Sequence, residues 1–461
     1  MEKVPLNSGG KSEYGLIETD IRVKNNSNPV SPKGFLPTKF WTRVIPAVGL
    51  VTLVCVVAFV FFRSSGETLT PIEENLQATA ELETGAYIDL EAKQGRIRGY
   101  VRNTRQGRNY LAFYKIPFAQ PPVGSLRFQE PQPAGSWEGL RDVNEVAPQC
   151  LQRIKYSPVV EAGGEEDCLN LNLYTPSVQN KSAFQLWCFT DGNGSRYGAE
   201  YFLDEDVVLI TIHYRLAAFG FLNSEDGVFP GNVGFKDQLM SLRWVKNNVA
   251  EYGGDPERSG ASVCNTLDLF SDNPLQRLRE VAEELNCPSN GTTAEIMECF
   301  MSKPPSEIAI ARPSTENGHF AASIDTNSPS VFMPDSPYKI LKDKKANSVP
   351  YILGIVTAEW LFDALAALHD PELYQFPYYG YLEIPFGDPE YYNFSEYFVK
   401  LWAQFAATGN PSGMNGLEWQ SSPSREGAFW FELNDSPGRT HILDERMQFW
   451  DQFTDSQLKL E

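Results

Sequence analysis

The chain has few histidines and a shortage of positive charge. Its 461 residues include four His, and 39 Lys and Arg stand against 59 Asp and Glu, so the formal net charge is −20 at pH 7. Lys and Arg neutralise phosphates in nucleic-acid complexes, and this shortage excludes nucleic acid as an expected partner. No C-x2-C pair or cluster of His accompanies the seven Cys, although such patterns mark zinc sites. We therefore predict no metal and no cofactor.

Charge is absent altogether from residues 44–62, which lie between Arg43 and Arg63. At helical rise this run is just long enough to cross a hydrocarbon core of about 30 Å, and it predicts a transmembrane helix. A signal peptide would place its apolar stretch within about the first 30 residues, and a buried core helix would show an amphipathic face. Basic side chains outnumber acidic ones before the run. The positive-inside rule then predicts a type II single-pass protein of the plasma membrane, with a cytoplasmic N-terminus and an extracellular remainder.

Composition divides the rest of the chain. Residues 1–43 are rich in Ser, Asn, Gly, Pro and Lys and predict a disordered cytoplasmic tail. Residues 63–85 predict a stalk, and residues 86–461 a globular ectodomain. The apolar run at 206–214 predicts a buried strand, and the spacing of apolar residues at 237–252 predicts a helix. A further helix is predicted at 396–409, and strands alternating with helices predict a largely parallel α/β sheet.

Six cysteines follow the predicted span. Cys150 with Cys168 and Cys287 with Cys299 would each close a short loop, which an oxidising compartment permits. Isolated buried thiols are the other interpretation. Beyond the predicted span, five N-x-S/T triplets predict sites of N-linked glycosylation: Asn180, Asn193, Asn290, Asn393 and Asn434.

Long stretches resemble the type B carboxylesterase and cholinesterase family. They are YKIPFAQPPVGSLRFQEPQPAGSW at 114–137, EDCLNLNLYTP at 166–176, YRLAAFGFLNSED at 214–226, PGNVGFKDQLMSLRWVKNNVAEYGGDPER at 230–258, FMPDSPYKIL at 332–341 and LWAQFAATGNPS at 401–412. The resemblance implies an α/β-hydrolase fold. It also implies the disulfides Cys150–Cys168 and Cys287–Cys299, which match two family disulfides.

The catalytic positions depart from the family pattern. Between Gly254 and Val263, GGDPER runs directly into SGASV, whereas the family has a hydrophobic strand and a G-x-S-x-G elbow that presents the nucleophile. Ser259 lies near this gap but outside a G-x-S-x-G frame. Glu359 stands at the position of the triad acid, and Gly380 at that of the histidine. The oxyanion loop is altered to Asp191, Gly192, Asn193 and Gly194, and an acidic residue there opposes oxyanion stabilisation.

These departures predict a catalytically inactive, cholinesterase-like surface protein, similar to the non-catalytic membrane-tethered members of the family. Adhesion or receptor-type recognition of an extracellular protein partner is the expected role, and a homodimer is one arrangement that it allows. The alternative is an incomplete isoform or gene model of a membrane-anchored carboxylesterase that hydrolyses carboxylic esters. Either way, the gap predicts a sheet that has lost its central strand and must pair again.

Overall fold

We describe the fold from a computed structural model. All described residues belong to one compact unit, residues 47–461. They are residues 56–61, 84–154, 159–179, 184–190, 198–263, 270–271, 273–313, 320–345, 351–352, 389–410, 430–432 and 439–441. The predicted tail at 1–43 and most of the predicted stalk lie outside these ranges.

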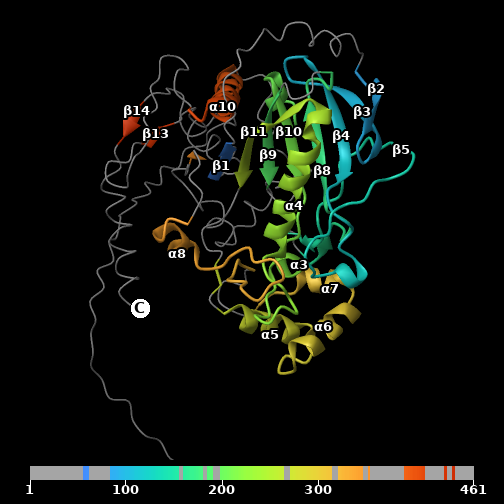
Figure 1. Cartoon of the computed structure of the whole chain (residues 1–461), viewed down its shortest axis with the longest axis vertical. Helices are drawn as coiled ribbons and strands as arrows, with labels where there is room; N and C mark the ends of the chain where they lie inside the picture. The colour runs from blue at the N-terminus through green and yellow to red at the C-terminus, as the bar shows by residue number, and fades with distance from the viewer. Residues whose placement is uncertain are drawn as a thin grey trace, which may run out of the picture. The chain divides into compact units, whose positions relative to one another are not determined.

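A ten-stranded mixed sheet forms the centre of the unit (Figure 1). Its strand order is β12-β1-β11-β9-β10-β8-β4-β3-β2, with β5 paired to β3. The strands are β1 (Val56–Phe61), β2 (Tyr87–Ala92), β3 (Gly95–Asn103), β4 (Asn109–Pro117), β5 (Leu140–Arg141), β8 (Asn170–Thr175), β9 (Phe184–Thr190), β10 (Val207–Ile212), β11 (Gly254–Val263) and β12 (Tyr351–Ile352). Two small ribbons, β6 (Gln152–Arg153) with β7 (Ala162–Gly163) and β13 (Trp430–Glu432) with β14 (Arg439–His441), lie apart from it.

The prediction of a largely parallel sheet is wrong. β9 runs parallel to β10 and to β11, but β2, β3, β4, β8 and β10 pair antiparallel with one another in sequence across the sheet. The physical reason is the length of the connections. Only residues 93–94 separate β2 from β3, and 104–108 separate β3 from β4. A parallel crossover needs a dozen or more residues, whereas a short turn joins antiparallel strands.

The predicted helices are present. The helices are α3 (Ala217–Phe221), α4 (Val233–Asn248), α5 (Pro274–Glu284), α6 (Thr293–Ser302), α7 (Pro305–Ile310), α8 (Pro337–Lys342) and α10 (Pro389–Thr408), with 3-10 turns η2 (Gly124–Leu126), η3 (Phe202–Asp204) and η4 (Val249–Tyr252). The segment predicted as helix at 237–252 is α4 followed by η4. α10 ends where Gly409 adopts a φ of +68° and its N–H donates to the carbonyl of Phe405 at 2.8 Å, a helix ending that glycine permits.

Alternating side chains of β4 divide the core between two faces of the sheet. Leu111 and Phe113 pack with Trp244 and Val245 of α4 in one cluster. Tyr110 and other residues of the opposite face pack with aromatic residues of α10 in a second cluster. A strand directs successive side chains to opposite faces, so the sheet is enclosed between α4 and α10 as a three-layer α/β/α arrangement. β10, the predicted buried strand at 206–214, is buried along its whole length.

A strand is present where we predicted one to be lost. Gly254–Val263 forms β11, which pairs parallel with β9 and has a register irregularity between Gly254 and Ser259. On its other side β11 pairs antiparallel with β1. The expectation of a missing central strand is thus corrected. The reason is that β9 has backbone donors and acceptors that need partners in the interior, and the residues flanking the gap supply them.

The described part of the predicted transmembrane run is extended. Val56–Phe61 forms β1, six residues with three valines, and β-branched residues fit well on a pleated sheet. The remaining residues of the 44–62 run lie outside the described ranges. Among the described residues, we find no helix with the length and apolar character to cross a membrane.

Two glycines allow α3 and α4 to approach the end of β10 closely. A Cβ atom would lie 2.2 Å from the backbone oxygen of Arg215 if added to Gly220, and 2.4 Å from it if added to Gly234. Since the obstacle is backbone, we expect Gly234→Ala to lower the free energy of unfolding by about 1–3 kcal/mol, as overpacking does. The matched control is Gly135→Ala, because nothing lies within 4 Å of a Cβ added there. Urea unfolding of both variants measures this, and equal stabilities would contradict the expectation.

Candidate functional site

The carboxyl ends of the parallel strands β9, β10 and β11 form the candidate edge of the sheet for a ligand site. β9 ends at Thr190 directly opposite Val263, the last residue of β11, and β10 runs parallel on the other side of β9. In open α/β sheets, ligands bind outside the carboxyl ends of such strands. The predicted oxyanion loop, Asp191–Gly194, begins immediately after Thr190. The residue that precedes this loop, Thr190, therefore lies beside the end of β11, the strand that contains the gap.

The remaining predicted catalytic positions are resolved only in part. Ser259 lies within β11 and is paired with Leu186 of β9, whereas an elbow serine stands in the turn after its strand. The oxyanion residues Asp191, Gly192, Asn193 and Gly194, and also Glu359 and Gly380, lie outside the described residues. Among the described residues, His, Cys, Asp and Glu form no group of three that could hold a metal ion.

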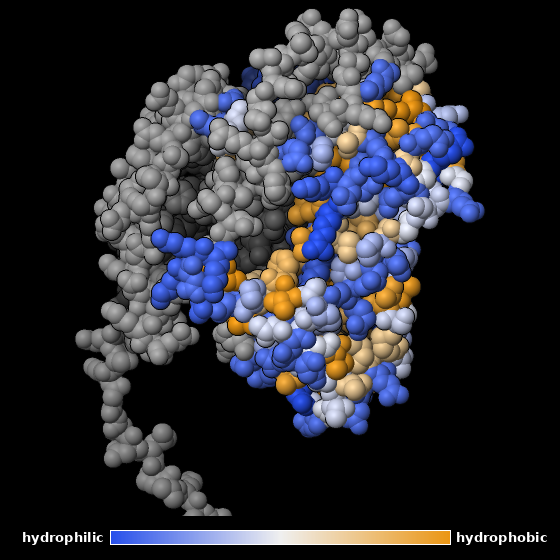
Figure 2. Space-filling model, in the orientation of Figure 1, coloured by the Kyte–Doolittle hydropathy of each residue, from blue (hydrophilic) through white to orange (hydrophobic). Residues whose placement is uncertain are grey.

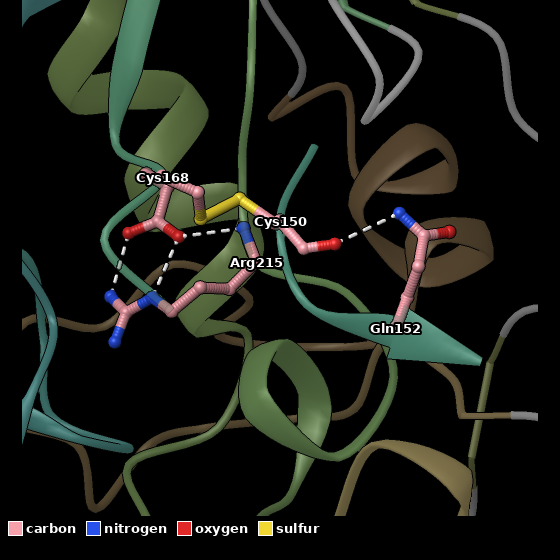
Figure 3. Close-up of a disulfide and its surroundings, with 5 residues drawn as sticks. Cys150, Gln152, Cys168 and Arg215 are labelled. Carbon is pink, nitrogen blue, oxygen red and sulfur yellow. Dashed lines mark hydrogen bonds and ion pairs between the residues drawn. A yellow bond between two sulfur atoms is a disulfide. The ribbon is translucent and has the colours of Figure 1, made fainter. Parts of the chain in front are cut away.

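A buried ion pair holds the chain that leaves β10. Arg215 and Asp237 of α4 have side chains 3% and 0% exposed. The guanidinium donates Nε to one carboxylate oxygen at 2.8 Å and Nη2 to the other at 2.6 Å, and the backbone N–H of Arg215 donates to the same carboxylate at 3.0 Å (Figure 3). A bidentate arrangement fixes orientation as well as charge. The pair thus anchors the start of α4 to the carboxyl end of β10.

A second buried cation ties three segments together at the start of α4. Lys236 Nζ lies 2.9 Å from Glu130 Oε1 and 3.0 Å from Asp325 Oδ2. Asp325 in turn accepts from the backbone N–H of Met333 at 2.7 Å. Neither this cluster nor the Arg215 pair is predicted by the sequence. The available signal was the adjacent charges Lys236 and Asp237 beside apolar residues at the start of α4, because a charged residue is rarely buried without a partner.

Both disulfides implied by the family resemblance are formed. Cys150 and Cys168 have a Cα–Cα distance of 5.0 Å, and Cys287 and Cys299 one of 5.8 Å. Figure 3 shows the first disulfide in the same view as Arg215, with Gln152 donating its side-chain N–H to the backbone oxygen of Cys150 at 3.1 Å. Both cysteines of this first pair belong to the core cluster between the sheet and α4. The prediction of two disulfides is confirmed.

His213, which follows β10, is fully buried, and the packing role that its position suggests is consistent with this. Burial lowers its pKa from the ordinary 6.5 to about 4. Between these values the unfolded chain binds a proton that the folded chain does not, so stability rises with pH. The contribution is complete above about pH 6.5 and is lost as the pH falls toward 4, on the order of 3 kcal/mol in all.

We therefore expect His213→Gln to flatten the pH dependence of stability over this range. Urea unfolding at pH 7 and at pH 4.5, for the original chain and the variant, measures the difference. An identical dependence in both proteins would contradict the assignment to His213.

The fold and the family of the chain agree. A mixed sheet enclosed between helices, with parallel strands β9, β10 and β11, is of the α/β class. The model of the Carboxylesterase family matches residues 87–261 and 258–378. The chain belongs to the carboxylesterase family, and this family has the α/β-hydrolase fold.

Individual relatives are similar over the same region. The chain is 33% identical over 326 residues to "Carboxylic ester hydrolase" of Bombus ignitus, covering 62% of this chain and 59% of that protein. It is 29% identical to "Juvenile hormone esterase" of Tribolium castaneum (61% and 57%) and 31% identical to "Carboxylesterase 3" of Homo sapiens (62% and 57%). The chain thus spans 57–59% of the length of each of these relatives.

These relatives correct the predicted function. They are named as ester hydrolases, whereas we expected a catalytically inactive adhesion or receptor-type protein. That expectation, including the statement that the protein is not an enzyme, is wrong. It gave too much weight to local departures in a sequence that otherwise follows a family of enzymes.

Proposed function

We propose that the protein represented by this chain is a hydrolase of carboxylic esters, and that the form which performs the reaction carries additional residues at the gap. One observation carries the proposal. The family match comes in two segments that meet at residues 258–261, which is where the sequence lacks the G-x-S-x-G elbow. An interruption at the elbow, with family sequence resuming at once on its far side, is what the removal of an internal segment would produce.

The roles follow from the chemistry of ester hydrolysis. A serine in the additional segment would attack the ester carbonyl, a histidine would accept its proton, and an acid would orient that histidine. Glu359 is the proposed acid. The serine and the histidine, for which this chain has the gap and Gly380, would come from the complete form. The loop after β9 would border the oxyanion, because β9 and β11 end side by side.

We also propose that the hydrolase unit lies outside the cell. Support comes from the two disulfides, which are typical of oxidising compartments. A membrane anchor formed by residues 44–62 is not part of this proposal, because Val56–Phe61 pairs with β11 and β12 in the sheet.

The test begins with the transcripts. Sequencing across the codons for Arg258–Pro274 and around Gly380 should find a form that encodes G-x-S-x-G at the gap and a histidine near Gly380. That form, expressed in a secretory cell, should hydrolyse p-nitrophenyl esters and react with a fluorophosphonate at the elbow serine. Serine-to-alanine substitution there should lower kcat by roughly six orders of magnitude.

The 461-residue chain is the control, since it lacks both the segment at the gap and the histidine near Gly380. Two outcomes would overturn the proposal. One is the absence of any transcript with residues inserted at the gap. The other is a longer form that neither hydrolyses the esters nor reacts with the probe.

A further inference from the structure

Two of the five glycosylation triplets lie in the described part of the chain, and they differ in structure. Asn290 and Asn393 are both exposed. Asn393 is inside the helix α10, and its triplet ends at Ser395, whose hydroxyl accepts a hydrogen bond from Arg105 Nη1. Asn290 lies in a turn before α6 begins. The two triplets match the same sequence motif, but one lies within a helix and the other in a turn.

The turn at Asn290 is held from several sides. The N–H of Gly291 donates to the carbonyl of Pro288 at 2.8 Å, which closes a β-turn with Asn290 at its third position. Arg279 Nη1 donates to the carbonyl of Ser289. The disulfide between Cys287 and Cys299 encloses this turn together with most of α6. The backbone is fixed in place while the Asn290 side chain faces solvent.

The same threonine serves both the triplet and the helix. Thr292 is the N-cap of α6: its hydroxyl accepts from the N–H of Glu295 at 3.2 Å, and its own N–H donates to Glu295 Oε2 at 2.7 Å. This reciprocal pair is a capping box. Around α6 the surface is made of hydrophilic residues interspersed with apolar ones (Figure 2). A solvated surface of this kind accommodates a bulky polar group without covering a large apolar patch.

We propose that Asn290, rather than Asn393, carries an N-linked glycan, so that the hairpin of α5 and α6 is exposed to the lumen of the secretory pathway and then to the cell exterior. In the reaction, the amide nitrogen of Asn290 bonds to the anomeric carbon of a lipid pyrophosphate-linked oligosaccharide. The bond from that carbon to the pyrophosphate oxygen breaks, the lipid pyrophosphate leaves, and the amide gives up one proton. No oxidation or reduction occurs in this step, and the disulfide around the turn points to the same compartment.

The experiment uses the full chain expressed in a secretory eukaryotic cell. Enzymatic deglycosylation converts a glycosylated Asn to Asp, and mass spectrometry of the peptide that contains Cys287–Cys299 should find Asp at position 290. Asn290→Gln should remove one glycan from the intact protein.

The variants Thr292→Asp and Thr292→Ser distinguish the role of Thr292 in the glycosylation triplet from its role as the helix N-cap. Aspartate is as good an N-cap as the original residue but ends the triplet, whereas serine keeps both the cap and the triplet. We expect the Asp variant to lose the glycan with α6 still folded, and the Ser variant to retain it. Peptides with unmodified Asn290 throughout, or a glycan at Asn393 with Asn290 empty, would overturn the proposal. Ester hydrolysis is not measured in this experiment. A failure of the glycosylation proposal is therefore distinguishable from a failure of the proposed function.

Discussion

Asp237→Ala is expected to lower the free energy of unfolding by about 3–5 kcal/mol, because it leaves Arg215 charged and buried without its counterion. Arg215 is 3% exposed at its side chain and Asp237 0%. The variant retains one contact, from Arg215 Nη1 to the backbone oxygen of Gln129 at 2.7 Å, but a neutral carbonyl does not balance the charge. A loss of this size is a large share of the stability of an ordinary domain.

The exposed pair of Lys339 and Asp343 is the matched control. Its N–O distance of 2.9 Å is close to that of the buried pair, but its side chains are 51% and 36% exposed. Water screens such pairs, and they contribute about 0–1 kcal/mol. Urea unfolding of Asp237→Ala and Asp343→Ala tests whether burial or distance determines the effect. Equal losses in the two variants, or a loss below about 1 kcal/mol for Asp237→Ala, would contradict the prediction.

A double replacement distinguishes the effect of an unpaired charge from the effect of lost packing. Replacing Arg215 with Met and Asp237 with Leu removes both charges and retains apolar volume, a change that is often neutral or stabilising for buried ion pairs. We expect this variant to recover most of the stability that Asp237→Ala loses. If it is as unstable as the single variant, the loss comes from packing rather than from the unpaired charge.

Removal of the Cys150–Cys168 disulfide has the second large expected effect. The two residues are 18 positions apart, and a loop of that length corresponds to about 3 kcal/mol of chain entropy in the unfolded state. Both cysteines are 1% exposed in the largest core cluster, so replacement by Ala also leaves unfilled volume. The Cys150→Ala, Cys168→Ala variant should therefore lose at least about 3 kcal/mol, measured by thermal unfolding.

The second disulfide provides the comparison. Cys287 and Cys299 are 12 positions apart, and the entropy term is again about 3 kcal/mol. Cys287 is 8% exposed and lies in the smaller cluster around α5 and α6, so less packing is lost. The Cys287→Ala, Cys299→Ala variant should be the more stable of the two. The reverse order would show that core packing around Cys150 adds nothing to the loop entropy.

Much of the fold could be predicted where the signal is local. The run of β10, apolar except for Thr211, predicted a buried strand, and all six of its residues are buried. The spacing at 237–252 predicted α4 because a helix turns its apolar residues to one side. The order of long family-like stretches predicted the hydrolase fold and both disulfides. The site was predicted less well, since a missing elbow was taken to mean a missing activity.

The predictions that failed concerned pairing. A strand's sequence does not state the direction of its neighbour, and the antiparallel half of the sheet follows from short turns and long-range partners. An apolar run of moderate length fits a strand or a helix equally well by pattern. Residues 56–61 are extended because β11 offers them backbone partners. In the same way, the flanks of the gap form a strand because β9 requires one.

The sequence by itself determined the family, the buried strands and helices, and the cysteines that pair. Each of these depends on residues close together in the chain or on a pattern long enough to identify. The tertiary structure alone decided that Arg215 and Asp237 form a buried pair, that Lys236 joins three segments, and that β11 closes the sheet beside β9. Those contacts join residues far apart in sequence, and their stability depends on exclusion of water and on backbone groups that need partners, neither of which exists until the chain has folded.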